Sequence, residues 1–162
     1  MVKPKVFITR RWPKEAEERL KKIFDVTLNQ DDKVLSNNEI AEGFYNHDAL
    51  ACTVSDTIDE NIIKSGKTGK GKIIANFGVG FNHIDLNACK KYKILVTNTP
   101  DVLTDATADL TILLMLMVSR RSKEGEFEIE NNKWAGWRPT HLLGSELSHK
   151  TLGIIGFGRI GQ

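Results

Sequence analysis

Short β-type runs alternate with helix-type segments over about the first hundred residues, and this alternation restricts the possible folds more than any other feature. Each run is rich in apolar and β-branched residues, and the segments between them have helical spacing. Strands joined by helices run parallel in one sheet. The sequence therefore predicts a doubly wound parallel α/β sheet of flavodoxin-like order over residues 1–100, with strands at 5–9, 24–28, 49–54, 72–76 and 94–97.

The helix-type segments carry their own start signals. Ser36 and Glu39 form the S-x-x-E pattern of a capping box, ahead of Ile40 and Phe44, which we expect to be buried. Asp85 is expected to cap a later helix. These signals predict helices in the places that the alternation requires.

The pattern changes after Pro100, where one long helix is predicted. Thr104 or Asp105 is expected to cap it, and it should end near Arg121. Its residues are apolar on nearly every side, so we expect burial on several sides, by a second domain or by a partner chain. A charged segment at 122–133 follows, and then an irregular connection.

A glycine-rich turn lies at the end of the sequence. Residues 152–155 form an apolar run typical of a buried strand, which leads into Gly156-x-Gly158-x-x-Gly161. In dinucleotide-binding turns these glycines permit a tight turn, close approach of the pyrophosphate and packing of the next helix. We therefore expect residues 101–162 to hold the long crossover helix and the first strand of a Rossmann domain, truncated after the glycine fingerprint.

Composition argues against several classes of function. The net charge is only +2, so nucleic acid is not an expected partner. The most apolar stretch, residues 110–118, is much shorter than the roughly 20 residues that span a bilayer. Cys52 and Cys89 have no metal-ligand spacing, so we expect reduced thiols and no metal site. The first residues do not resemble a signal peptide, and the expected location is the cytoplasm.

Two loops compete as ligand sites. Residues 66–72 superficially match a phosphate-binding P-loop, but Ile73 stands where that motif needs Ser or Thr, and a solvated turn is the better interpretation. The second loop follows the fourth predicted strand, at the sheet edge where such folds bind ligands. Its glycines could expose the amides of Val79 and Gly80 to a carboxylate. The alternative is a plain turn, with His83 on the surface.

Four segments together resemble the D-isomer-specific 2-hydroxyacid dehydrogenases, and most closely their glyoxylate/hydroxypyruvate reductase branch. They are residues 5–11, 76–85, 96–110 and 153–162. The resemblance implies that this chain is the N-terminal portion of an oxidoreductase that reduces 2-oxo acids to D-2-hydroxy acids with NADPH or NADH.

The resemblance also assigns roles to residues of this chain. It implies that the Val79 and Gly80 amides bind the substrate carboxylate and that Thr104 contacts the cofactor. The residues that would cradle the pyrophosphate are Gly156, Gly158, Arg159, Ile160 and Gly161. It further implies a homodimer formed through the helix at 104–121 and the region of Trp134 and Trp137.

The chain also departs from the family pattern. The catalytic arginine, histidine and carboxylate are expected downstream of Gln162, so we expect no catalytic residue in this chain and no activity from it alone. The chain's four histidines, His47, His83, His141 and His149, do not match the catalytic one. Lys93 stands where the family usually has a helix-ending glycine, and His141 stands where the reductases often have an aromatic residue.

Two alternatives to the reductase assignment remain at this point. One is a non-catalytic binding or dimerisation module of the same fold. The other is a fragment of a phosphoglycerate- or formate-type dehydrogenase of the same family. The sequence does not distinguish NAD from NADP, because the strand end that reads the ribose would follow Gln162.

Overall fold

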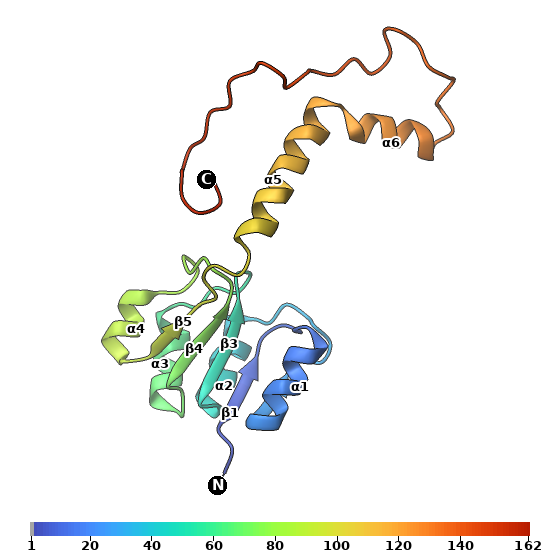
Figure 1. Ribbon diagram of the computed structural model, residues 1–162. Coiled ribbons are helices and arrows are strands. Elements are labelled where there is room, and N and C mark those ends of the chain that lie inside the picture. Colours follow the sequence, from blue (N-terminus) through green and yellow to red (C-terminus); the bar gives the residue numbers. More distant parts are fainter. Residues whose placement is uncertain (1) are drawn as a thin grey trace. The chain divides into compact units, whose positions relative to one another are not determined.

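The computed structural model describes residues 2–162. The chain forms two compact units, one ending at Asp101 and the other running from Val102 to Gln162. The first unit holds a sheet with helices, and the second holds two helices followed by irregular chain (Figure 1).

All five strands of the first unit run parallel in the order β2-β1-β3-β4-β5. This order confirms the predicted flavodoxin-like sheet. The chain winds outward in both directions from β1 and β3, so the connections at the carboxyl ends of these two strands diverge and leave a crevice where ligands bind in this class of sheet. The strands are β1 (Lys5–Ile8), β2 (Asp25–Leu28), β3 (Ala49–Thr53), β4 (Ile73–Phe77) and β5 (Leu95–Thr97).

Four helices cover the sheet. They are α1 (Lys14–Ile23), α2 (Asn37–Asn46), α3 (Glu60–Thr68) and α4 (Leu86–Tyr92). Residues of α2, α3 and α4 pack with Leu50 and Ile74 in the larger core cluster. Leu20, from α1, packs with Ile8 and Ala51 in the smaller one. Leu50 and Ala51 are neighbours in β3, so the two clusters lie on opposite faces of the sheet.

Local signals in the sequence explain where these helices begin. Ser36 Oγ accepts a hydrogen bond from the Glu39 amide, and the Ser36 amide donates to the Glu39 carboxylate, which confirms the predicted capping box. The ammonium of Lys33 and these groups of Ser36 lower the pKa of Glu39 to about 2. Asp85 caps α4 by accepting from the Ala88 amide, as predicted.

Close packing in the larger cluster depends on small residues next to large ones. Phe44 and Ile40 are buried, as predicted. A Cβ added at Gly66 would collide with the Phe44 ring, so α2 and α3 approach closely only because that position has no side chain. At the end of α4, Lys93 has φ of 56°. A left-handed conformation costs a lysine about 1 kcal/mol relative to glycine.

The second unit differs from the first in having no buried helix. It contains α5 (Thr104–Ser119) and α6 (Ser122–Glu130), and neither has a buried residue. The prediction that Thr104 or Asp105 caps α5 is wrong. The N-cap is Leu103 and has no side-chain cap bond, because the turn before it already brings Thr104 into the helix.

The predicted strand at residues 152–155 is absent. A parallel strand exists only when it pairs with a neighbour, and among the described residues after Thr97 there is no other strand. Ile155 and Phe157 are accordingly exposed. Gly156 has φ of 92°, a backbone conformation that favours glycine and suits a tight turn.

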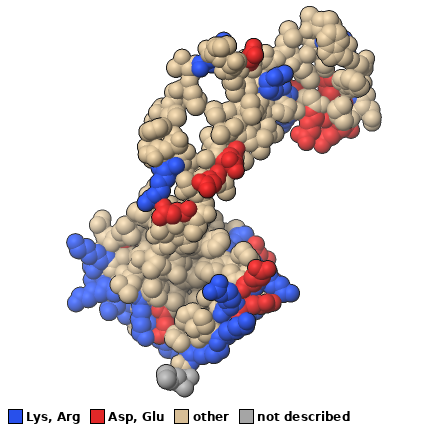
Figure 2. Space-filling view, viewed as in Figure 1, with Lys and Arg blue, Asp and Glu red and all other residues tan. Residues whose placement is uncertain are grey.

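Acidic side chains lie among the lysines and arginines on the face of the first unit seen in Figure 2. Within residues 2–162, no helix combines the length and apolar character needed to cross a membrane. The same residues contain no cluster of potential metal ligands.

Candidate functional site

The loop that follows β4 is held in place by the side-chain amides of two asparagines. The side-chain nitrogen of Asn76, Nδ2, donates to the carbonyl oxygens of Gly78, at 3.1 Å, and Gly80, at 2.8 Å. The Nδ2 atom of Asn98, just after β5, donates to the carbonyl oxygen of Val79 at 2.9 Å. Three successive carbonyl groups of the loop are therefore fixed.

Fixing these carbonyls also orients the amides. In a trans peptide the C=O and the following N–H point in opposite directions. The Gly78 carbonyl belongs to the same peptide as the Val79 N–H, and the Val79 carbonyl to the same peptide as the Gly80 N–H. Both N–H groups therefore point away from the two asparagine side chains. Among the described residues, neither N–H has an acceptor.

The space around this loop is open next to Gly80 and filled next to Gly78. Gly80 is exposed, and a Cβ added there would meet no atom within 4 Å. A Cβ added at Gly78 would collide with the Val54 side chain. The loop can therefore approach β3 closely while presenting two adjacent N–H donors. Such a pair can bind a carboxylate or another small anion.

His83 contacts this loop through Asn76. The imidazole nitrogen Nε2 of His83 lies 3.0 Å from the Asn76 oxygen Oδ1. Asn76 Nδ2 donates both of its hydrogens to carbonyl groups, so Asn76 meets His83 with its oxygen, which can only accept a hydrogen bond. The Nε2 atom of His83 must therefore carry a proton. Partial burial lowers the pKa of His83, and the nearby Asp56 carboxylate opposes this shift. His83 thus stabilises the loop through its hydrogen bond to Asn76, and we assign it no catalytic role.

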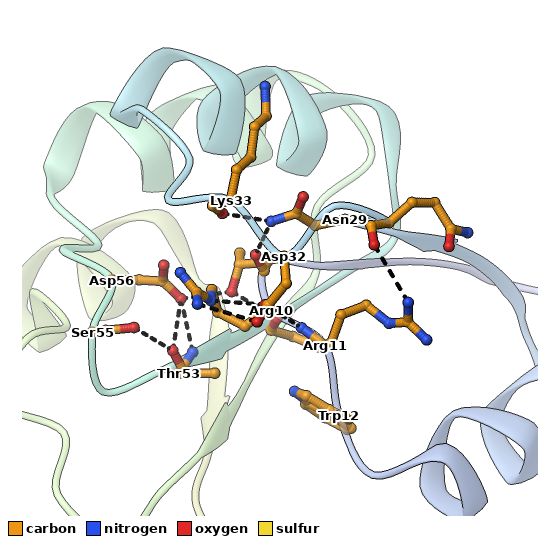
Figure 3. Close-up of polar contacts among 12 residues, drawn as sticks. Arg10, Arg11, Trp12, Asn29, Asp32, Lys33, Thr53, Ser55 and Asp56 are labelled. Atoms are coloured by element: carbon orange, nitrogen blue, oxygen red, sulfur yellow. Dashed lines mark hydrogen bonds and ion pairs between the residues drawn. The ribbon is translucent and has the colours of Figure 1, made fainter.

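Asp56 fastens β3 to β1 at the same edge of the sheet. Its carboxylate accepts from the Thr9 hydroxyl at 2.6 Å and from the Thr53 amide at 2.8 Å (Figure 3). The residue is only 8% exposed. Burial and, to a lesser extent, Asp56 raise the pKa of Cys52 to about 12, so this buried thiol is protonated at neutral pH and is a poor nucleophile.

Two arginines lie at the carboxyl end of β1, where sequence reasoning found no site. Arg10 pairs with Asp32, with 3.0 Å between Nε and Oδ1, and Arg11 pairs with Glu17, with 2.8 Å between Nε and Oε1. The Arg11 backbone amide is the main group that lowers the pKa of Asp32. The sequence shows adjacent arginines but not their partners. Because the structure supplies a carboxylate for each, we treat them as structural.

The predicted cofactor residues lie in the second unit. Thr104 is the first residue of α5 and is partly buried. Gly156, Gly158, Arg159 and Ile160 are exposed, and Gly161 is partly buried. The positive φ of Gly156 and the open space at Gly156 and Gly158 fit a phosphate-binding turn. The residues that follow form a turn, so the helix N-terminus that would complete such a cradle is not formed.

Comparison with known proteins agrees with the α/β class that this sheet defines. Residues 6–155 match the family model of the D-isomer specific 2-hydroxyacid dehydrogenase catalytic domain. The chain therefore belongs to the D-isomer specific 2-hydroxyacid dehydrogenase family, as its sequence motifs suggested.

Individual relatives support this assignment. The chain is 42% identical to a glyoxylate reductase of Thermococcus litoralis over 99% of its own length and 49% of that protein. A solved structure from Polaromonas sp. JS6 66, whose name assigns it to the same family and describes it as NAD-binding, matches with a TM-score of 0.89. The match has 38% identity and covers 98% of this chain and 50% of that one.

A second solved structure is an NADPH-dependent glyoxylate/hydroxypyruvate reductase from Sinorhizobium meliloti, in complex with NADP and malonate. It matches with a TM-score of 0.79 and 26% identity, over 98% of this chain and 48% of that one. In all three comparisons the chain spans about half the length of its relative.

Proposed function

We propose that this chain supplies the carboxylate-binding part of an NAD(P)H-dependent oxidoreductase that reduces glyoxylate- or hydroxypyruvate-type 2-oxo acids to D-2-hydroxy acids. The observation that carries the proposal is the pair of N–H groups at Val79 and Gly80, turned outward by Asn76 and Asn98. The similarity to a glyoxylate reductase and to a reductase bound to malonate, a small carboxylate, supports the same substrate class.

In this proposal the chain's own residues bind and orient the substrate. The carboxylate accepts hydrogen bonds from the Val79 and Gly80 amides, which fixes the adjacent carbonyl carbon relative to the loop. A nicotinamide cofactor supplies the hydride when bound. Thr104 would contact it, and the turn residues Gly156, Gly158, Arg159, Ile160 and Gly161 would hold its pyrophosphate. Catalytic acid–base groups are not assigned to this chain, and we expect the 162 residues alone to oxidise no NADPH with glyoxylate.

The experiment that tests the carboxylate site is an amide NMR titration of the 162-residue protein with oxalate, a stable dicarboxylate. We expect the Val79 and Gly80 amide signals to shift in a saturable way, because both N–H groups gain a charged acceptor. Oxamide, which has the same size but no charge, is the matched control and should shift them little. If oxalate moves neither signal, the proposed carboxylate site is wrong.

We also propose that the chain forms a homodimer through residues 104–121 and the region of Trp134 and Trp137. Leu110, Leu113 and Leu114 are each about half exposed, and Trp137 is 81% exposed. Apolar surface of this extent is typical of an interface. Sedimentation should show a dimer that a charge at Leu113 weakens. A monomer at all concentrations would contradict the proposal.

A further inference from the structure

The side chain of Asn76 connects the loop after β4 to His83 and to β3. It lies at the carboxyl end of β4, opposite Cys52 in the register with β3, and is 3% exposed. Its two amide hydrogens go to the carbonyls of Gly78 and Gly80, and its oxygen faces His83. The thiol of Cys52 also points at that oxygen, at 3.8 Å.

These contacts give the carboxamide one orientation. If it turned over, its oxygen would face two carbonyl oxygens and its NH₂ group would face the Nε2–H of His83. Each of those pairings sets like partial charges against each other in a buried place, and buried polar groups without partners cost about 1–3 kcal/mol each. The two carbonyl groups therefore decide which way Asn76 faces, and the Nε2–H of His83 stabilises that orientation by donating to Asn76 Oδ1.

On the basis of the proposed carboxylate site, we propose that Asn76 is a positioning residue of that site and that His83 stabilises the orientation of its side chain. Asn76 holds the Gly78 carbonyl and so sets the peptide plane that aims the Val79 amide at the substrate. Asn98 holds the Val79 carbonyl and so sets the plane that aims the Gly80 amide. The amides are thereby oriented before the anion arrives. Binding then needs no rearrangement of the loop, which favours affinity.

The test compares oxalate affinity among variants by amide NMR, with the thermal unfolding midpoint measured for each. Asn76→Asp keeps the shape but replaces both donors by acceptors, and Asn76→Ala removes the group without adding charge. We expect oxalate binding at least about tenfold weaker in both, which corresponds to the loss of one or two oriented hydrogen bonds. Asn82→Asp adds the same charge on an exposed loop residue whose side chain makes no hydrogen bond within residues 2–162, and it should weaken binding much less.

The outcomes separate the two proposals. If the wild-type protein does not bind oxalate, the carboxylate site itself is wrong. If it binds, and folded Asn76→Asp and Asn76→Ala variants bind equally well, the positioning role is wrong. If the Asn76 variants do not fold, the His83→Ala variant tests the positioning role, because it removes the imidazole donor to Asn76 Oδ1 and leaves both hydrogen bonds from Asn76 to the loop carbonyls in place. We expect it to lower the unfolding midpoint, because the buried Asn76 Oδ1 loses its imidazole donor, and to weaken oxalate binding by the folded protein about threefold. Unchanged affinity would overturn the proposal.

Discussion

Phe44, Ile8 and Leu50 in the first unit have no exposed surface, whereas leucines of α5 in the second unit are about half exposed. The two units contain similar kinds of apolar residue, so composition does not cause this difference. In the first unit the apolar residues alternate with strand and helix periods that place them on shared faces. In α5 they surround the helix, and no element of the second unit encloses them. Burial therefore depends on elements that meet, and local apolar character alone does not produce it.

The largest expected effect tests this contrast in the cores. Phe44→Ala should lower the free energy of unfolding by about 4 kcal/mol, because it leaves a cavity between α2 and α3. Leu114→Ala, in α5, should change that of the monomer by less than about 0.5 kcal/mol, because this side chain is half exposed when no partner covers it. Urea unfolding followed by circular dichroism measures both. Similar losses in the two variants would show that the units share one core, and the comparison would fail.

The first unit was largely predictable because its signals are local. The five β-type runs and the Ser36 capping box specify where elements begin, and the alternation specifies a parallel sheet. The apolar run at 152–155 was misleading for the complementary reason. Its residues resemble a strand, but a strand depends on a neighbour that local sequence does not describe.

The candidate site, like the fold, was predictable only where its signals are local. Its glycines and its place after β4 could be read from the sequence, and the family resemblance then assigned Val79 and Gly80. The side chains that hold these two amides in place could not be predicted. Asn98 reaches the Val79 carbonyl across 19 positions, and Arg10 reaches Asp32 across 22. Which partner such side chains find is decided by the sheet order, and single residues of these types occur commonly in loops.

A smaller loss of unfolding free energy is expected from substitutions at the N-terminal ends of helices in the two units. Ser36→Ala should cost about 1 kcal/mol of unfolding free energy, because the Glu39 amide loses its acceptor at the start of α2. Thr104→Ala should cost much less, because Thr104 is not the N-cap of α5. Thermal unfolding of the two variants checks the difference. A larger loss from Thr104→Ala would mean that its hydroxyl stabilises α5 in some other way.

The smallest effect concerns a polar group that the first unit partly buries. Burial disfavours the charged form of His83, so its pKa in the folded protein lies below the ordinary value of 6.5. In the unfolded chain the same imidazole takes up a proton at higher pH. Between these two pKa values the unfolded state binds more protons, and stability contributed by His83 therefore rises as pH increases through this range and is lost as pH falls.

Nitrogen NMR of the His83 ring measures both parts of this prediction. The titration midpoint should lie below 6.5, and the neutral ring should carry its proton on Nε2, because that atom donates to Asn76. Protonation then occurs at Nδ1 and leaves the bond to Asn76 intact. The orientation of Asn76 should for this reason survive acidification as long as the unit stays folded. A neutral ring protonated at Nδ1 instead would mean that the Asn76 amide faces the other way, with its oxygen toward the loop carbonyls.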